Sequence, residues 1–234
     1  MTDMPQPVDF DARPPMPVTE YEQTVKRVNV GYDLVMTTTE CFLRALRQPE
    51  LDLLVVGAGG GEEVERFLPE NPGWRLTGVD PSRDMLALAQ AKVERLGVRE
   101  RTTLIQGQVA DLPAEARFGA ATCLFVLHFL PDDDKRTLLR EIAARLRSGA
   151  PLLLAAGSRP DRGGLSDDFL GAWQEYGESL GMPAEQMAAT IQGILAQPNK
   201  TTEEDYERLL REAGFTRVAR YFSALSGMSA WLAR

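Results

Sequence analysis

The sequence contains very little cysteine and histidine: two cysteines, Cys41 and Cys123, and one histidine, His128, in 234 residues. The cysteines lie far apart, and neither belongs to a CxxC or Cys/His ligand spacing, which argues against a disulfide framework and against a zinc site. We therefore expect reduced core thiols and no metal. A single histidine also leaves only one side chain whose ordinary pKa suits a base near neutral pH.

Long apolar runs and an excess of basic residues are also missing. No run approaches the roughly 18 residues of a membrane span, and the start, MTDMPQPVDF, lacks the basic and apolar segments of a signal peptide. These absences predict a cytoplasmic protein with no membrane partner. Acidic residues outnumber basic ones by 34 to 26, for a formal charge of −8. Such a surface repels polyanions, so nucleic acid is a disfavoured partner.

The chain divides into an arm and one domain. Residues 1–18 hold five prolines and few apolar residues, which predicts a flexible arm that could fold over a ligand. Residues 19–234 are enough for a single α/β domain with its own core. Apolar residues recur at roughly helical spacing over 19–50, and the pattern breaks at Gly31, so we expect two helices before the first strand.

After Glu50 short apolar runs alternate with helical patterns. Runs of this kind are typical of buried parallel strands, which we expect over 51–56, 75–80, 102–106, 120–127 and 151–156. The helices between them are predicted over 62–68, 84–96 and 133–146. A helical insertion or lid over 158–199 contains two further helices, and a helix over 202–213 begins with the capping pair Thr202 and Asp205.

The chain ends in two β-rich runs, 216–224 and 228–234, joined closely enough for a hairpin. The whole pattern predicts an α/β fold: a Rossmann-like, doubly wound, mostly parallel seven-stranded sheet with a C-terminal antiparallel hairpin strand.

A glycine loop lies between the first strand and the following helix. The segment LLVVGAGGGEEV places glycines at positions 57, 59 and 61, where backbone can approach a ligand at the carboxyl ends of the strands. A tight turn alone would also use glycine. The second signal is Asp80, which closes the next strand before Pro81, where a carboxylate can accept hydrogen bonds from both hydroxyls of a ribose. Asp80 alone could be a turn residue, but together the two features indicate an adenosyl ligand.

The spacing of the glycines separates two classes of cofactor. A dinucleotide fingerprint needs a third glycine at position 62, which is Glu62. A carboxylate there would repel a pyrophosphate at the helix N-terminus. The GxGxG spacing instead resembles the first motif of class I S-adenosylmethionine-dependent methyltransferases. Further matching phrases are GQVADLP at 107–113, LFVLHFLPDDD at 124–134 and the terminal hairpin.

This resemblance covers nearly the whole chain and implies S-adenosyl-L-methionine as the cofactor. By the resemblance, Gly57, Ala58 and Gly59 line the methionine part, while Asp80 binds the ribose. It also implies that Met85, Gln108 and Val109 lie near the adenine, and that Leu124 and Phe125 lie near the sulfonium. The predicted cofactor-binding residues are Tyr32, Gly57, Ala58, Gly59, Gly61, Asp80, Pro81, Met85, Gln108, Val109, Leu124 and Phe125.

Within this class the sequence most resembles carboxy-S-adenosylmethionine synthase and the methyltransferases similar to it. The matching pieces are NVGYD at 29–33, EAGF at 212–215 and YFSALSGMSAWLA at 221–233. By this match Tyr32 reaches the methionine end, although a core tyrosine is an equal alternative. The chain departs at Leu124 and Leu209, where the synthase has polar partners for its extra carboxylate, so plain S-adenosylmethionine is favoured. The chain also has Val55, two residues before the first glycine of the loop, where many methyltransferases have an acidic residue.

Three further groups of residues are candidates. His128 is the candidate catalytic base, with a hydrogen-bonded loop histidine as the alternative. Trp173 and Tyr176 belong to an aromatic stripe in the insertion that could contact the acceptor, or else pack on the domain or on the second subunit of a homodimer. Residues 132–134 are three consecutive aspartates, which we interpret as a helix N-terminus rather than a metal site.

The leading hypothesis is a methyltransferase that acts on a small-molecule acceptor by in-line displacement. Alternatives are an enzyme like carboxy-S-adenosylmethionine synthase or one of a tRNA-modification pathway, a non-catalytic adenosyl-ligand-binding protein, and a nicotinamide-dependent reductase. The sequence leaves open the acceptor, the atom methylated and the oligomeric state.

Overall fold

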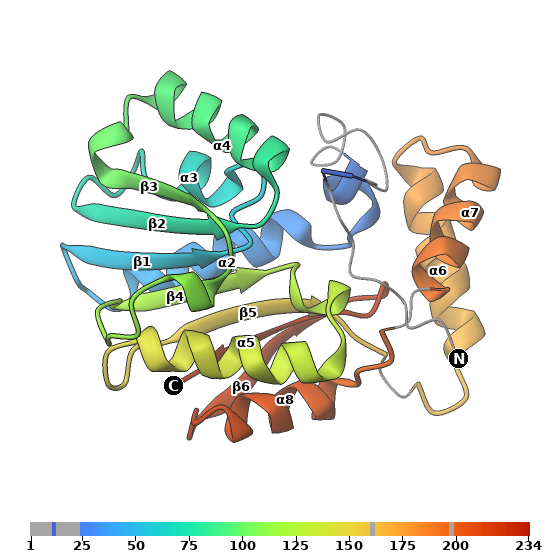
Figure 1. The fold of residues 1–234 in the computed structure, drawn as a ribbon. Helices are drawn as coiled ribbons and strands as arrows, with labels where there is room; N and C mark the ends of the chain where they lie inside the picture. Colours follow the sequence, from blue (N-terminus) through green and yellow to red (C-terminus); the bar gives the residue numbers. More distant parts are fainter. Residues whose placement is uncertain (1–10, 13–23, 160–161, 197–198) are drawn as a thin grey trace.

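The computed structural model describes residues 11–12, 24–159, 162–196 and 199–234 (Figure 1). At its centre is one seven-stranded sheet with the strand order β3-β2-β1-β4-β5-β7-β6. The strands are β1 (Leu51–Val56), β2 (Trp74–Asp80), β3 (Thr102–Gln106), β4 (Ala120–Leu124), β5 (Leu152–Gly157), β6 (Val218–Ser223) and β7 (Met228–Ala233). The first five strands pair in parallel, and β7 runs antiparallel to both β5 and β6. The predicted fold class is confirmed.

Alternating side chains of the strands fill two core layers, one on each face of the sheet. Along β1, Leu53 and Val55 belong to one buried cluster, whereas Leu54 and Val56 belong to the other. Helices α2 (Tyr32–Arg44), α3 (Glu62–Phe67) and α4 (Arg83–Leu96) cover the first face, and α5 (Asp132–Arg145) and α8 (Glu203–Glu212) cover the second. The strand order reverses where β1 lies between β2 and β4, and ligands bind such sheets at that point.

Most elements end within a residue or two of their predicted bounds, and one does not. The strand predicted over 120–127 is wrong beyond Leu124, because Phe125 adopts a φ of +64° and Leu127–Phe129 forms a 3-10 turn. Residues 24–28 are helical, and α2 begins directly after Gly31, which has a φ of +82°. The prediction of an arm over residues 1–18 lies outside the described residues except at residues 11–12.

The two helices found within residues 158–199 are α6 (Ser166–Ser179) and α7 (Ala184–Leu195). Figure 1 shows them as a pair beyond the carboxyl ends of the parallel strands. They share a third buried cluster, which joins Trp173, Met187 and Ile191 to Val28 of the lead-in helix. The pair therefore packs on the segment that precedes α2. Among the described residues no helix is long and apolar enough to cross a membrane.

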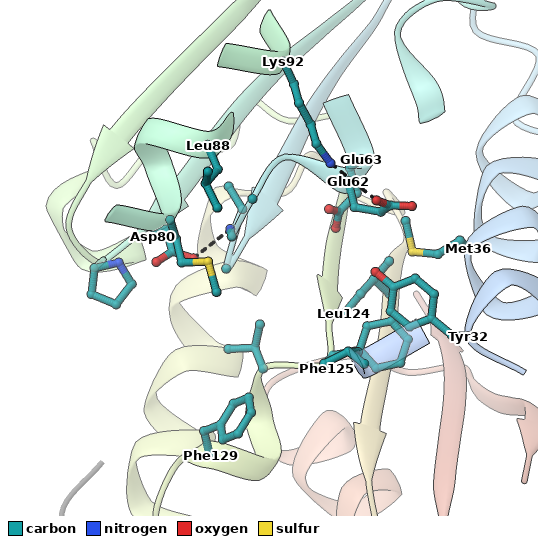
Figure 2. A pocket seen from close by; sticks show the side chains of 18 of the residues that line it. Tyr32, Met36, Glu62, Glu63, Asp80, Leu88, Lys92, Leu124, Phe125 and Phe129 are labelled. Carbon is teal, nitrogen blue, oxygen red and sulfur yellow. Dashed lines mark hydrogen bonds and ion pairs between the residues drawn. The ribbon is translucent and has the colours of Figure 1, made fainter. Parts of the chain in front are cut away.

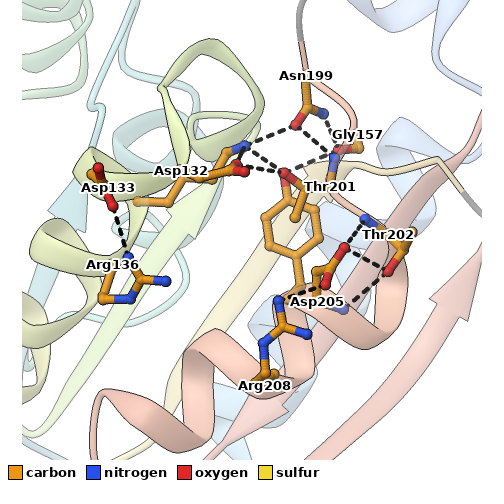
Figure 3. A network of polar contacts seen from close by, with 11 residues as sticks. Asp132, Asp133, Arg136, Gly157, Asn199, Thr201, Thr202, Asp205 and Arg208 are labelled. Carbon is orange, nitrogen blue, oxygen red and sulfur yellow. Dashed lines mark hydrogen bonds and ion pairs between the residues drawn. The ribbon is translucent and has the colours of Figure 1, made fainter.

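A polar network around Lys135 ties residues 158–199 to the sheet (Figure 3). The Lys135 side chain is 1% exposed, and its ammonium donates to Asp132 Oδ1 (2.8 Å), Asn199 Oδ1 (2.9 Å) and Thr201 Oγ1 (2.5 Å). Asn199 Nδ2 also donates to the Gly157 carbonyl (2.8 Å). Because three acceptors satisfy the three donors of the buried ammonium, the network holds both ends of this segment against α5.

Candidate functional site

The glycine loop leaves β1 at the point where the strand order reverses. Gly57, Gly59 and Gly61 have φ angles of +71°, +49° and +81°, a region that favours glycine. A Cβ on Gly57 would lie 2.3 Å from Val126 Cγ2, and one on Gly61 would lie 2.9 Å from Ala89 Cα. At Gly59 the nearest atom would be 3.8 Å away. Gly57 and Gly61 therefore allow close packing, while Gly59 leaves free space beside the backbone.

Asp80 is fixed by the same loop. Its carboxylate accepts hydrogen bonds from the Gly59 amide (2.8 Å) and from the Ser82 amide (2.9 Å), and the residue is 8% exposed. Burial raises the pKa of Asp80, and the two amide hydrogen bonds oppose that shift. Each carboxylate oxygen keeps further capacity to accept a hydrogen bond from a ligand hydroxyl. The two sequence signals thus form a single unit.

A cavity of about 550 Å³ opens beside this unit (Figure 2). Its volume lies within the range of roughly 300 to 1,000 Å³ that is typical of small-molecule sites. Nine of the predicted cofactor-binding residues lie on its wall: Tyr32, Gly57, Ala58, Gly59, Asp80, Pro81, Met85, Leu124 and Phe125. They come from α2, β2, α4, β4 and the loops that follow β1, β2 and β4, so the fold brings together residues distant in sequence. Their contact with a cofactor stays a prediction.

Three other predicted cofactor-binding residues are not part of this wall. Gly61 packs against α4 at Ala89. Gln108 precedes the short turn Val109–Asp111, where its backbone amide donates to Asp111 Oδ2 (2.7 Å). Val109 is buried in the second core cluster. The place of Gln108 and Val109 near the adenine and the contact of Gly61 with the cofactor stay predictions.

An aromatic pair forms the wall on the side of α2. The rings of Tyr32 and Phe125 stack with centroids 4.7 Å apart and an angle of 18° between their planes. Phe125 adopts its positive φ while its amide donates to the Ala155 carbonyl (2.7 Å). A bulky residue in this conformation costs about 1 to 3 kcal/mol and persists only where the surroundings fix it, which is common at functional sites. The strained backbone at the end of β4 aims the ring at Tyr32.

His128 takes part in a structural hydrogen bond. Its Nδ1 accepts from the Gly157 amide (3.2 Å), and its ring packs on Phe129 with centroids 4.2 Å apart. Desolvation, followed by the charges of Lys135 and Arg159, lowers the pKa of His128 to about 4. The imidazole ring is thus neutral at physiological pH, and the lone pair of Nδ1 already accepts the hydrogen bond from the Gly157 amide. This geometry favours the loop-histidine alternative, and a catalytic role stays a prediction.

The side chains of the aromatic stripe on α6 contact different parts of the protein. Trp173 is 2% exposed, and its indole Nε1 donates to the Val28 carbonyl (3.0 Å). Phe169 lies under the Arg162 guanidinium, 3.9 Å from its ring centroid, and Leu180 is 45% exposed. Neither Trp173 nor the partly buried Tyr176 belongs to the cavity wall. The arrangement favours packing on the lead-in helix, and contact of either residue with an acceptor stays a prediction.

The cavity also contains residues that we did not predict. Figure 2 labels six of them, Met36, Glu62, Glu63, Leu88, Lys92 and Phe129, and the others are Val25, Gly60, Ala91, Arg95, Val126 and Leu130. Glu62 and Glu63 follow the glycine loop directly, and this position at the start of α3 is the sequence signal that could have placed them at the site. Glu62 is 8% exposed and pairs with Lys26 Nζ (3.1 Å), Arg66 Nε (2.5 Å) and Lys92 Nζ (3.6 Å).

Comparison with known proteins points to the same class. Residues 53–149 match a family described as a methyltransferase domain. Over its full length the chain superimposes on 96% of a putative S-adenosyl-L-methionine-dependent methyltransferase of Methanococcus maripaludis, with a TM-score of 0.66 and 17% identity. The resemblance to class I S-adenosylmethionine-dependent methyltransferases is thus confirmed in sequence and in fold.

More particular resemblances follow from curated relatives. The chain is 28% identical to carboxy-S-adenosyl-L-methionine synthase of Chromohalobacter salexigens over 64% of this chain and 56% of that protein. It is 26% identical to the ubiquinone/menaquinone biosynthesis C-methyltransferase UbiE of Rhizobium rhizogenes, over 75% of this chain and 69% of that protein. The chain therefore spans only about half the length of the synthase. These similarities support S-adenosyl-L-methionine as the cofactor.

Proposed function

We propose that this protein transfers a methyl group from S-adenosylmethionine to a small, largely apolar acceptor. The observation that carries the proposal is the Gly59 amide hydrogen bond to Asp80, which fixes a buried carboxylate on the wall of the cavity. The residues fit the cofactor. Asp80 offers acceptors for ribose hydroxyls, and Gly59 leaves the space that a Cβ would fill.

S-adenosylmethionine supplies an already activated methyl group, so the protein's task is to hold two substrates in line and to exclude water. Apolar side chains are available for this: Leu124 ends β4, Phe125 and Phe129 follow it, and Met36 of α2 also lines the cavity (Figure 2). Such a wall desolvates an aromatic or aliphatic acceptor but offers few partners to a highly charged one. Together with the charge of −8, it favours a metabolite over a nucleic acid.

A dedicated base is not part of the proposal. A base is needed only where the acceptor must lose a proton before or during attack. The Nδ1 lone pair of His128 already accepts from Gly157. We therefore assign His128 a positioning role in the loop after β4, and the acceptor atom provides its own lone pair.

A carboxylated cofactor and a nicotinamide cofactor fit the cavity less well. Leu124 lines the wall and offers no hydrogen-bond partner to an additional carboxylate. Leu209 is 3% exposed in the second core cluster, so that position does not bear on the ligand. Glu62 also occupies the position at which a dinucleotide fingerprint has its third glycine, and its side chain lines the cavity.

Ligand-induced thermal shifts test the cofactor assignment. S-adenosylmethionine and S-adenosylhomocysteine are expected to raise the melting temperature, and Asp80→Ala is expected to abolish both shifts, because it removes the ribose acceptor. The matched control is Asp84→Ala, which changes an exposed aspartate in the first turn of α4. A shift with NAD(H) and none with S-adenosylmethionine would overturn the assignment.

Turnover tests the transfer itself. The purified protein is incubated with S-adenosylmethionine and a panel of small phenols, amines and carbon nucleophiles, and mass spectrometry follows S-adenosylhomocysteine and an acceptor heavier by one methylene unit. Formation of both products supports the proposal. Tight cofactor binding with no turnover on any acceptor would favour a non-catalytic binding protein.

A further inference from the structure

Glu63 carries a buried carboxyl group on the cavity wall that forms no ion pair with the described residues. The residue is 6% exposed, and its Oε1 accepts a long hydrogen bond from Thr122 Oγ1 (3.5 Å). Among the described residues no lysine or arginine forms an ion pair with Glu63, whereas its neighbour Glu62 has three such partners. The nearby lysine and arginine side chains therefore pair with Glu62 and Glu65 rather than with Glu63, and the cavity is the direction from which Glu63 can gain a partner.

The surroundings keep the carboxyl group of Glu63 protonated when the cavity holds no ligand cation. Desolvation raises its pKa to about 8, and the charge of Glu62 on the same helix adds to this shift. The hydrogen bond from its own backbone amide lowers the pKa, as do the Thr122 hydroxyl from β4 and the charge of Lys92 from α4, without cancelling the rise. The Cys123 thiol, also from β4, interacts with Glu63 as well, and burial holds that thiol in its neutral form.

Figure 2 shows Asp80 on one side of the cavity and the two glutamates on the other, near Tyr32 and Met36. If the ribose lies at Asp80, the part of the cofactor that extends along the glycine loop is its amino-acid end, which carries an ammonium group. Val55, two residues before the first glycine of the loop, is buried and apolar and cannot receive that charge. Two buried carboxyl groups on this wall, those of Asp80 and Glu63, form no ion pair with the described residues, and Asp80 is assigned to the ribose, which leaves Glu63 for the ammonium.

We infer that Glu63 receives the ammonium group of the amino-acid end of S-adenosylmethionine and thereby selects cofactors that carry this group. The inference rests on the proposed function, because it takes the adenosyl ligand to be anchored at Asp80. Binding is then coupled to a proton. The neutral carboxyl loses its proton to solvent, and the resulting carboxylate pairs with the ammonium, which keeps its own three protons.

Three adenosyl compounds separate the groups that Glu63 could recognise. S-adenosylmethionine has both ammonium and sulfonium, S-adenosylhomocysteine has only the ammonium, and 5′-methylthioadenosine has neither. Isothermal titration of the full chain is expected to show that Glu63→Gln lowers the affinity for S-adenosylmethionine and S-adenosylhomocysteine about 10- to 100-fold. A loss of this size corresponds to one charge-assisted hydrogen bond. The substitution should leave the affinity for 5′-methylthioadenosine unchanged, which also shows that the variant is folded.

Glu65→Gln is the matched control, since Glu65 lies on the same helix but pairs with Lys92 and Arg95. It is expected to bind all three compounds as the wild type does. The inference is overturned if Glu63→Gln lowers the affinity for all three compounds equally, or lowers it for none of them. A lower affinity for S-adenosylmethionine alone also overturns it and would assign Glu63 to the sulfonium instead. Failure of the wild type to bind any of the three would refute the proposed function itself, which is a separate outcome.

Proton release gives a second readout that does not depend on affinity. Titrations of S-adenosylhomocysteine near pH 7 in buffers of different ionisation enthalpy should report the release of close to one proton per ligand. The release should be much smaller near pH 9, where Glu63 is already largely ionised, and absent in Glu63→Gln. A wild type that releases no proton near pH 7, or a Glu63→Gln variant that still releases one, contradicts the coupling.

Discussion

The Ser82 hydroxyl donates a hydrogen bond to Asp11, which lies 71 positions earlier in the chain (2.6 Å). The same carboxylate accepts from the backbone amides of Arg83 (3.0 Å) and Asp84 (3.2 Å). Ser82 is itself the N-cap of α4 and accepts from the Met85 amide (3.1 Å). An aspartate from the N-terminal segment therefore completes the cap of the helix that begins beside Asp80 and Pro81.

Removing this carboxylate should loosen the start of α4. We expect Asp11→Ala to speed amide hydrogen exchange at Arg83 and Asp84, because both amides lose their acceptor. Asp11→Asn keeps a side-chain oxygen and should change the exchange less.

The hydrogen bonds from Ser82 and the two amides lower the pKa of Asp11. The protection of the Arg83 and Asp84 amides from exchange should therefore persist below about pH 4 and be lost as the pH falls through the lowered value. Unchanged exchange in Asp11→Ala would refute the cap.

Two glycines with similar backbone but different surroundings give a test of the loop. Gly61→Ala should lower the free energy of unfolding by about 2 to 4 kcal/mol, because it adds a collision with α4 to the strain of its φ of +81°. Gly97 has a φ of +65°, but a Cβ there would have no neighbour within 4 Å. Gly97→Ala should therefore lower the free energy of unfolding by only about 1 kcal/mol. Urea unfolding measures both. Equal losses would show that close packing at Gly61 contributes nothing.

His128 should make stability depend on pH in the acidic range. Its pKa is about 4 in the folded protein and about 6.5 in the unfolded chain, so the unfolded state binds more protons between these values. The free energy of unfolding should therefore fall as the pH drops from about 6.5 to 4, by at most about 1.4 kcal/mol per pH unit. His128→Asn retains an acceptor for the Gly157 amide and should flatten this decline. A decline that persists undiminished in the variant would assign it to other groups.

The sheet and the glycine loop could be predicted because their signals are local. A buried parallel strand is a short apolar run, so each strand is marked in the sequence, and Asp80 lies where such a run ends. The capping pair Thr202 and Asp205 is equally local, and both reciprocal hydrogen bonds are present. These features depend on residues only a few positions apart.

Features that depend on distant packing could not be predicted. Residues 125–127 read as a continuation of β4, but the position of Phe125 is set by its ring contact with Tyr32 from α2. Glu63 looks like an ordinary acidic residue at a helix start, and only the assembled cavity shows that it is buried. Asp11 lies in a proline-rich segment with no pattern of its own, and its partners are in α4. In each case the deciding neighbour is far away in sequence.

The network around Lys135 allows the segment between Gly157 and Asn199 to vary in length among related domains. Because Asn199 bonds directly to the Gly157 carbonyl, the intervening chain leaves and rejoins the sheet at nearly one point. The free energy of closing a loop rises only with the logarithm of its length, so longer or shorter segments can be accommodated between these anchors at little cost. The segment that contains α6 and α7 can therefore change in length while the glycine loop and Asp80 stay in place.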